Sequence, residues 1–555
     1  MKYTAHLDTF AADHLPPRET WPQLTFELPE LQYPQRLNCA AELLDRQIAA
    51  GYGAHRCIMD PQSTWTYQEF AVKVAQLAHA LRDDMHVVPG NRVLLRAPNS
   101  PMLAACWFAV MRVGAIAVTT MPLYRYGELT YMIEKAQVTF ALCDVRLRDD
   151  LERAAAQHSL LTTVRYFNSQ APDSLEALMR EKPKEFDAVP TAADDVALIG
   201  FTSGTTGKAK ATMHFHRDVT AICDCFPRSV LKASAEDVFC GSPPLGFTFG
   251  LGGILLFPLH IGAASLLVEK ATPEFLLQGI QDCKATVCFT APIAYRAMSR
   301  MLERFDISSL RKCVSAGETL PLPIWQDWYE RTGIKIIDGI GGTEMLHIYI
   351  ASPEEKMRPG STGQVVPGYH ARVVDDAGIE LPAGTVGRLA VRGPTGCRYL
   401  DDPRQTSYVQ NGWNFPGDAY HVDNDGYFWY CARTDDMIVA AGYNISGPEV
   451  EEALLAHPEV KECAVVSAAD PERGTNMVKA FVVLNPDVPA DDGLCKRLQD
   501  FVKSRIATYK CPREIAFVDA LPRTETGKLQ RFVLRKRPAE RSTSRELPRS
   551  PRSQP

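Results

Sequence analysis

Short apolar runs alternate with helix-period segments through most of the chain. An apolar run at Arg92–Pro98 precedes a helical pattern near Met102–Val113, and a second apolar run follows at Gly114–Thr120. This alternation predicts an α/β fold with layered, parallel-rich sheets. After Gly363 the strand-like content rises, as in the segments at 371–376 and 387–393, which predicts a smaller β-rich subdomain.

A separate small domain is predicted near the C-terminal end. Residues 448–468 have the pattern of a helix followed by a strand, residues 478–485 that of a strand, and residues 494–506 that of an amphipathic helix. We therefore expect a large N-terminal domain over 1–434 and a small α+β domain over 435–535. Residues 536–555 are basic, rich in Ser and Pro and poor in apolar residues, which predicts a disordered tail.

Charge and cysteine content narrow the class of protein. A net charge of −6 gives the chain no polycationic surface, so we expect no nucleic-acid partner. Its 15 cysteines include no CxxC pair and are expected to be reduced thiols in a cytoplasmic protein. The most apolar stretch, 251–268, contains Pro, His and several Gly, so a buried strand–turn–strand is expected there rather than a membrane helix.

A loop rich in small hydroxyl residues follows the predicted strand Val196–Ile199. Its glycines allow the backbone to wrap an anion, and its hydroxyls and serial amides can donate to phosphate oxygens. It is not a Walker A loop, because Thr202 and Ala209 occupy two of that motif's required positions. The alternative is an ordinary surface turn. The candidate phosphate-binding residues are Thr202, Ser203, Gly204, Thr205, Thr206, Gly207, Lys208 and Lys210.

This loop resembles the signature of the adenylate-forming superfamily, which includes acyl- and aryl-CoA ligases, luciferases and peptide-synthetase adenylation domains. The usual form has Pro where this chain has Ala209. Further family motifs follow in the expected order, and the resemblance covers about Trp65 to Arg531. It implies an enzyme that activates a carboxylic acid with ATP and Mg²⁺ and then transfers the acyl group to coenzyme A.

The resemblance also implies a nucleotide site. Ser315–Pro321 resembles the segment beside the adenine, and Asp338–Glu344 resembles the second nucleotide motif. In the family pattern Asp338 accepts from the adenine amino group, Thr343 contacts the α-phosphate and Glu344 holds Mg²⁺. The remaining nucleotide residues implied are Ala316, Gly317, Glu318, Gly339, Ile340 in place of a common aromatic residue, Asp418 as the ribose clamp and Arg433 on ribose and phosphate.

The small domain carries the other residues that the resemblance assigns. Lys528, in Leu521–Lys528, matches the catalytic lysine of adenylate formation. Asp435 matches the hinge about which the small domain rotates between the two half-reactions. Gly442 and Tyr443 match positions along the coenzyme A tunnel.

The acid is expected to be a small aromatic carboxylic acid. Segments Ala211–Arg217 and Met121–Leu129 resemble those of 2-aminobenzoate–CoA ligases in particular. The expected acid-binding residues are His214, Phe247, Thr248, Phe249, Gly341, His347 and Ile348, with His214, Thr248 or His347 as acceptor for a ring amine. His347 and Ile348 match ring-contact positions of the benzoate-type subgroup, which Met345–Ile350 resembles. For Phe247 and Phe249, plain core packing is the alternative. The alternatives are a benzoate, hydroxybenzoate or medium-chain fatty acid–CoA ligase, an adenylation enzyme that loads a carrier protein, and a non-catalytic relic. The sequence leaves the assembly state open, with a homodimer among the expected states.

Overall fold

The computed structural model describes residues 3–157, 159–202, 209–434, 436–440, 443–470, 475–486, 488–490, 492–506, 508–524 and 527–536. Its contacts divide the chain into two compact units, Met1–Tyr430 and Cys431–Pro555. The division falls within strand β21 (Phe428–Arg433). Of the tail that the sequence predicts to be disordered, residues 537–555 lie outside the described part of the chain.

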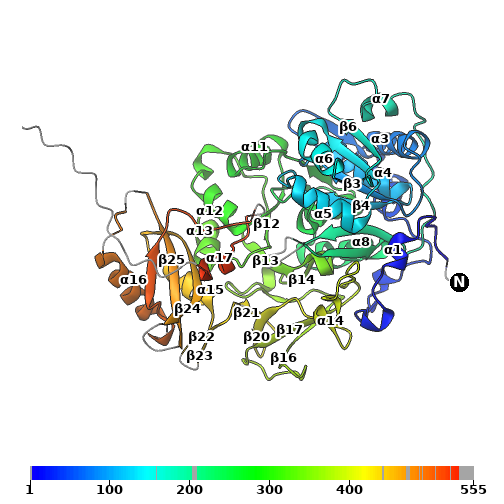
Figure 1. The fold of residues 1–555 in the computed structure, drawn as a ribbon. Helices are drawn as coiled ribbons and strands as arrows, with labels where there is room; N and C mark the ends of the chain where they lie inside the picture. The colour runs from blue at the N-terminus through cyan, green and yellow to red at the C-terminus, as the bar shows by residue number, and fades with distance from the viewer. Residues whose placement is uncertain are drawn as a thin grey trace, which may run out of the picture. The chain divides into compact units, whose positions relative to one another are not determined.

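A mostly parallel sheet forms the first layer of the large unit (Figure 1). The ladder is parallel from β6 through β7, and the last pair, β7 with β8, is antiparallel. Helices α3 to α6 lie around its central strands. The strand order is β6 (Thr163–Phe167), β5 (Phe140–Asp144), β3 (Arg92–Arg96), β4 (Ile116–Thr120), β7 (Val196–Phe201) and β8 (Ala211–Phe215).

Local signals in the sequence explain why these elements form where they do. Helix α4 (Pro101–Arg112) starts after Ser100, whose hydroxyl accepts from the amide of Leu103 at 3.3 Å. Helix α3 (Tyr67–His79) starts with a capping box between Thr66 and Glu69. The predicted helix near 102–113 and the strands on either side of it are therefore confirmed as α4, β3 and β4.

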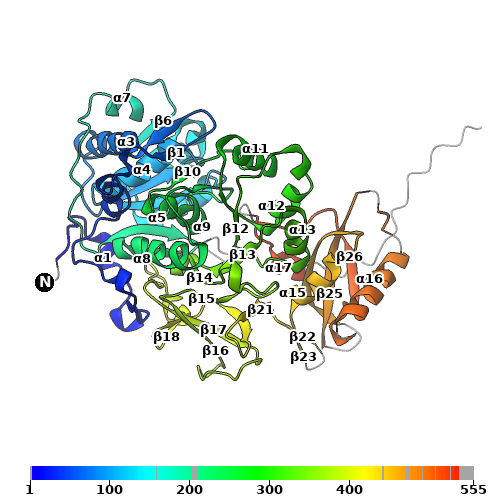
Figure 2. The ribbon, with the colours of Figure 1, turned by 180° about the vertical axis from the view of Figure 1, so that it is seen from behind.

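A second sheet lies beside the first, and helix α8 (His216–Phe226) contacts β7 and β8 of the first sheet and β14 of the second (Figure 2). The second sheet is parallel from β13 to β1 and antiparallel at both ends. Its order is β15 (Gln364–Val365), β14 (Ile348–Ala351), β13 (Ile336–Gly341), β12 (Lys312–Ser315), β11 (Val287–Thr290), β9 (Val238–Gly241), β10 (Ala264–Leu266), β1 (Arg56–Met59) and β2 (Thr64–Thr66).

A third, antiparallel sheet is the β-rich subdomain that the sequence predicts after Gly363. Its strands are β16 (His370–Val374), β17 (Gly387–Arg392), β18 (Val409–Gln410), β19 (Trp413–Asn414), β20 (Asp418–Val422) and β21. The other helices of the large unit are α1 (Phe10–Asp13), α2 (Arg46–Ala49), α5 (Tyr126–Ala136), α6 (Arg148–Ala155), α7 (Leu175–Met179), α9 (Thr248–Leu251), α10 (Phe257–His260), α11 (Pro273–Cys283), α12 (Pro292–Ser299), α13 (Leu322–Thr332) and α14 (Gln405–Tyr408).

The sequence prediction was wrong in the apolar stretch 251–268. The structure has helix α9, a π-helical turn over Gly252–Leu256 and helix α10 before strand β10, instead of a strand–turn–strand. This helical segment is buried on nearly all sides, so its sequence lacks the polar positions that reveal a helical period. Among the described residues, no helix is both long enough and apolar enough to cross a membrane.

The C-terminal unit has its own core and its own sheet. Strands β24 (Val460–Asp470) and β25 (Thr475–Leu484) form an antiparallel pair, and β26 (Glu514–Phe517) joins β25 in parallel. A short hairpin of β22 (Ile438–Ala440) and β23 (Tyr443–Ile445) precedes them. Its helices are α15 (Gly447–Leu455), α16 (Asp492–Arg505) and α17 (Arg531–Arg535).

Candidate active site

The phosphate-binding loop predicted from the sequence connects β7 to β8. Residues 203–208 lie outside the described part of the chain, and with them Ser203, Gly204, Thr205, Thr206, Gly207 and Lys208. The two ends of the loop are joined to each other. The amide of Thr202 donates to the carbonyl of Lys210 at 2.9 Å, and the amide of Lys210 donates to the hydroxyl of Thr202 at 3.1 Å. The two ends of the loop are therefore held together by hydrogen bonds where β7 ends and β8 begins.

Lys210 faces the predicted metal-binding carboxylate. Its Nζ lies 3.4 Å from Oε1 of Glu344, and the hydroxyl of Tyr399 donates to the same oxygen at 2.5 Å. Lys210 also lies over the rings of Tyr399 and Tyr408, 4.8 and 5.5 Å from their centroids. Burial raises the pKa of Tyr399, so its hydroxyl stays protonated and remains a donor. Lys210 and Tyr399 thus both contact Oε1 of the Glu344 carboxylate.

Sequence reasoning missed Tyr399. It lies in a loop that pairs with β8, because Met213 donates to the carbonyl of Arg398 and Leu400 donates to that of Ala211. Nothing in the local sequence marks this tyrosine, since its partner Glu344 is 55 residues away.

Thr343 starts the short 3₁₀ turn Thr343–Met345 directly after β13. Its carbonyl accepts from Nε2 of His214 at 2.7 Å. A Cβ atom added to Gly200 would lie 3.1 Å from the Thr343 methyl and 3.9 Å from the Thr248 methyl. The predicted phosphate contact Thr343 and the predicted acid contact Thr248 therefore meet over one glycine of β7.

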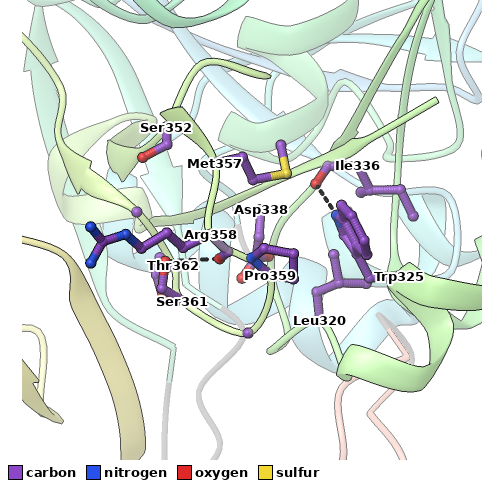
Figure 3. Close-up of a pocket in the computed structure, with 12 residues that line it drawn as sticks. Leu320, Trp325, Ile336, Asp338, Ser352, Met357, Arg358, Pro359, Ser361 and Thr362 are labelled. Atoms are coloured by element: carbon purple, nitrogen blue, oxygen red, sulfur yellow. Dashed lines mark hydrogen bonds between the residues drawn. The ribbon is translucent and has the colours of Figure 1, made fainter. Parts of the chain in front are cut away.

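A pocket of the large unit is built around Asp338 (Figure 3). Burial raises the pKa of Asp338 to about 7, although backbone amides of Gly339 and Leu320 oppose the rise. Its Oδ1 is buried and has no hydrogen-bond partner among the described residues. The ring of Trp325 forms one wall and is fixed by a 3.1 Å bond from Nε1 to the carbonyl of Ile336. An unpaired acceptor in such a pocket suits a ligand that carries an amino donor.

The other wall of this pocket was not predicted from the sequence. It is the loop Met357–Gly363, whose Ser361 hydroxyl donates to the carbonyl of Arg358 at 3.0 Å. Its run of Arg, Pro, Gly, Ser and Thr is the sequence feature that could have indicated this loop.

In the segment predicted to lie beside the adenine, Ala316 is buried and Gly317 has φ +90, a conformation that favours glycine. A Cβ at Gly317 would meet nothing within 4 Å, so the backbone beside it is open to a ligand. Glu318 and Ile340 are both partly buried.

Aromatic rings surround His347, one of the predicted acid-binding residues, which is itself buried. Its ring centroid lies 4.4 Å from that of Phe257, 5.8 Å from those of Phe226 and Phe249, and 6.4 Å from that of Phe289. Burial lowers the pKa of His347 to about 3, while the backbone of Phe249 opposes this. The imidazole is therefore neutral, and neither ring nitrogen makes a well-formed hydrogen bond with a described residue.

The other predicted acid-binding residues lie at the start of helix α9, on strands β13 and β14, and on strand β8. Phe247 packs edge-on against Tyr124 at 6.5 Å, next to Thr248 at the start of α9. Gly341 and Ile348 pair across β13 and β14. His214 is fully buried, and its Nε2 is directed at Thr343 rather than at this aromatic cluster.

The remaining predicted residues fall into the two units. Asp418 starts β20 of the large unit and is buried. Arg433 ends β21, and Lys528 is an exposed residue of a turn in which Thr524 donates to the Lys528 carbonyl at 2.8 Å. Tyr443 starts β23. Asp435 and Gly442 lie outside the described residues.

Glu344 suits a magnesium ion that arrives with a phosphate ligand. Within the described part of the chain, no group of three His, Cys, Asp or Glu residues could form a metal site from protein atoms alone. Mg²⁺ usually takes one or two carboxylates and completes its shell with water and substrate phosphates. One oriented carboxylate beside the phosphate loop meets this requirement.

Comparisons with known proteins agree with this geometry. The AMP-binding enzyme family matches residues 45–398, and the AMP-binding enzyme C-terminal domain matches residues 449–528. A benzoate–CoA ligase of Thauera aromatica is 34% identical over 91% of this chain and 97% of its own length. A 4-hydroxybenzoate–CoA/benzoate–CoA ligase of Rhodopseudomonas palustris is 32% identical over 90% of this chain and 94% of its own length.

Solved structures show the same fold. The anthranilate CoA ligase AuaEII in complex with anthranoyl-AMP superimposes with a TM-score of 0.87 and 32% identity, covering 92% of this chain and 98% of that one. A benzoate CoA ligase from Burkholderia xenovorans gives a TM-score of 0.82 and 30% identity over 90% of this chain and 100% of its own. The chain belongs to the AMP-binding enzyme family and is an AMP-forming acyl-CoA synthetase of the adenylate-forming, benzoate-type subgroup.

Proposed function

We propose that this enzyme is an aryl acid–CoA ligase and that 2-aminobenzoate is its preferred acid. The observation that carries the proposal is the neutral, buried His347 inside a cluster of aromatic rings, with neither ring nitrogen in a well-formed hydrogen bond to a described residue. Flat walls favour a rigid planar acid over a flexible chain, because such an acid loses less conformational freedom on binding. The unprotonated nitrogen of His347 would accept from the ring amine.

In the first half-reaction, a carboxylate oxygen of the acid attacks the α-phosphorus of ATP. The bond to the bridging oxygen breaks, and pyrophosphate leaves with the electron pair. Thr343 and the loop from Thr202 to Lys210 would donate to phosphate oxygens, and Lys528 would neutralise charge between the two reacting anions. A magnesium ion held by Glu344 would supply further neutralisation of the phosphates.

The adenine and ribose of ATP would be bound by two carboxylates, an arginine and an apolar side chain. Asp338 would accept from the adenine amino group through its unpaired Oδ1. Asp418 would accept from the ribose hydroxyls, and Arg433 would donate to ribose and phosphate. The adenine ring would lie along Ala316–Glu318 and against the apolar side chain of Ile340.

In the second half-reaction, the sulfur of coenzyme A attacks the acyl carbon. The bond between that carbon and the phosphate oxygen breaks, AMP leaves, and the thiol proton passes to solvent. Lys528 would occupy the space that the thiol needs in this step. The small domain would therefore rotate about Asp435 and bring Gly442 and Tyr443 to the pantetheine chain. A cytoplasmic location and a homodimeric state stay predictions of the sequence.

The test is kcat/KM for 2-aminobenzoate, benzoate, 2-hydroxybenzoate and octanoate with ATP, Mg²⁺ and coenzyme A. We expect 2-aminobenzoate to exceed benzoate by about tenfold to a hundredfold, since an unpaired buried acceptor costs about 1–3 kcal/mol. A preference for octanoate would reject the aryl pocket. Equal values for benzoate and 2-aminobenzoate would keep the aryl acid and reject the amine acceptor. Replacing coenzyme A by a carrier protein separates the ligase from a carrier-loading enzyme.

The two half-reactions test the role of Lys528. Lys528→Ala should abolish most ATP–pyrophosphate exchange, while thioester formation from pre-made 2-aminobenzoyl-AMP continues at nearly the wild-type rate. Equal losses in both assays would contradict the proposed role, because they would point to a general defect of the small domain.

A further inference from the structure

A fully buried histidine supports the turn that carries Thr343 and Glu344. His214 lies on β8, and its Nε2 is 2.7 Å from the carbonyl oxygen of Thr343, 129 residues further along the chain. A carbonyl oxygen can only accept, so the proton of the neutral imidazole must be on Nε2. The hydrogen bond thus defines both the tautomer of His214 and the position of the Thr343 backbone.

A buried ion pair lies behind this histidine. Oδ2 of Asp218 accepts from Nη1 of Arg398 at 2.8 Å and from the amide of Phe215 at 3.0 Å, and both charged side chains are completely buried. The same oxygen is 3.9 Å from Nδ1 of His214, which is too far for a direct hydrogen bond. Asp218 is therefore neutralised by Arg398 and does not hold a proton on Nδ1.

The charged groups around His214 agree with a neutral ring. Burial is the largest influence and lowers the pKa of His214 to about 4; Arg398 also lowers it, while Asp218 and Glu344 raise it. The guanidinium of Arg398 is itself enclosed between the rings of Phe215 and Trp21, 4.0 and 5.2 Å from their centroids. Replacement of Arg398 would leave the buried Asp218 with the Phe215 amide and a 4.0 Å contact to Arg217 in place of its close ion pair.

Arg398 and Tyr399, neighbours in the loop after β17, thus lie behind the turn Thr343–Met345 that carries Thr343 and Glu344. Arg398 pairs with Asp218 behind His214, which bonds Thr343, and Tyr399 donates directly to Glu344. The methyl group of Thr343 is also held against Gly200. The backbone oxygen and the methyl group of Thr343 are both fixed by buried neighbours.

We propose that His214 is a positioning residue for the adenylation half-reaction, through its hydrogen bond to the Thr343 carbonyl, and that it does not contact the acid. The Thr343 carbonyl fixes the tautomer that donates from Nε2, and the Asp218 carboxylate, bonded to Arg398, lies too far from Nδ1 to compete for the proton. The Thr343 hydroxyl and the Glu344 carboxylate are thereby presented to the α-phosphate and its metal ion. This inference rests on the adenylation chemistry proposed above.

The test compares His214→Leu with His214→Gln in the full-length enzyme. Leucine removes the donor, whereas the glutamine amide can donate to the same carbonyl. For His214→Leu we expect kcat of ATP–pyrophosphate exchange to fall about tenfold to a hundredfold, since displacement of a reacting contact by about 1 Å has effects of this size. KM for the acid should change less than about twofold, and thioester formation from pre-made 2-aminobenzoyl-AMP should be unaffected. His214→Gln should recover most of kcat.

His216→Gln is the matched control, because His216 is equally buried but contacts Cys39 through Nδ1. It should lose thermal stability while its kcat for exchange stays close to that of the wild type. Should His214→Leu fail to fold, His214→Gln alone decides, since kcat within about fivefold of the wild type supports a donor role.

Two results would overturn the inference. The first is a raised KM for the acid with kcat unchanged in His214→Leu, which would make His214 an acid contact. The second is equal loss in both half-reactions with no recovery by glutamine, which would make its role merely structural. Absence of exchange with any aryl acid in the wild-type enzyme would instead reject the proposed function itself.

Discussion

The hydroxyl of Tyr399 donates to Oε1 of Glu344 at 2.5 Å, and Nζ of Lys210 lies 3.4 Å from the same oxygen. A neutral donor and a cation therefore share one carboxylate oxygen in a partly buried site. Because burial keeps the pKa of Tyr399 high, this donor persists at any pH at which the protein is folded. The orientation of Glu344 is set before any metal ion binds.

Tyr399→Phe should raise the Mg²⁺ concentration that half-saturates ATP–pyrophosphate exchange. Loss of the donor frees the Glu344 carboxylate to rotate, and a hydrogen bond to a charged group contributes about 1.5–3 kcal/mol, which corresponds to tenfold or more. KM for the acid should be unchanged. Tyr408→Phe is the control, since its ring also lies near Lys210 but, among the described residues, the bond to Oε1 of Glu344 comes from Tyr399. Identical Mg²⁺ curves for Tyr399→Phe and the wild type would contradict this prediction.

Gly200→Ala should impair adenylation by displacing Thr343. The new Cβ would lie 3.1 Å from the Thr343 methyl, a distance at which the neighbour must shift by a few tenths of an ångström. We expect kcat for exchange to fall about tenfold, because the turn that carries Thr343 moves with it.

The double variant Gly200→Ala/Thr343→Ser gives the sharper test of this contact. Serine keeps the hydroxyl and lacks the methyl group that collides, so the second change should restore most of the lost activity. Gly127→Ala is the control, since a Cβ there meets nothing within 4 Å. If Thr343→Ser does not rescue Gly200→Ala, the collision is not the cause of the loss.

Asp338 should make adenosine binding depend on pH. Burial raises its pKa to about 7 from the ordinary 3.8, and an amino donor favours the ionised carboxylate. Binding should therefore tighten by at most about tenfold as the pH rises from about 6 to about 8, and then level off. Adenosine is the suitable ligand because it has no phosphate that titrates in this range. Asp338→Asn should bind more weakly and show a flat profile.

The same carboxyl group should affect stability in the opposite direction. Since the folded-state pKa lies above the unfolded value, ionisation costs stability as the pH rises from about 4 to about 7, and the full cost persists above this range. Asp338→Asn should melt at a higher temperature than the wild type near pH 8, and the difference should vanish near pH 4. A constant difference across this range would show that Asp338 does not titrate as expected.

Sequence patterns located the elements whose periodicity is visible in a short window. The buried strands β3 and β4 and helix α4 follow from the alternation at 92–120, and Asp338 and Glu344 follow from a compact motif. The helices within 251–268 did not follow, because a segment buried all round has no polar face.

Contacts between distant segments were also beyond sequence reasoning. The partnership of Tyr399 with Glu344 depends on how the loop after β17 pairs with β8, and no local signal reports this. The resemblance of Ala211–Arg217 to the corresponding segment of particular ligases predicts an acid-binding role for His214. Its bond to Thr343 becomes visible only when β8 and the turn after β13 are placed together.

The last prediction concerns the preference for an amine-bearing acid. Phenylalanine is planar like histidine, so His347→Phe keeps an aromatic ring, one atom larger, among the surrounding rings and removes both ring nitrogens. The ratio of kcat/KM for 2-aminobenzoate over benzoate should then fall about tenfold or more, while benzoate turnover stays nearly unchanged. Because the pKa of His347 is lowered to about 3, the imidazole is neutral throughout the working range, and the wild-type ratio should not vary with pH.

Two further variants separate loss of the acceptor from loss of the pocket. Gly252→Ala would place a Cβ 2.4 Å from Cδ2 of His347, so the imidazole must move and turnover of both acids should fall together. His214→Gln should leave the ratio unchanged, since that histidine is directed at Thr343. If His214→Gln compresses the ratio and His347→Phe does not, the amine acceptor is His214, and both the pocket assignment and the positioning role fail together.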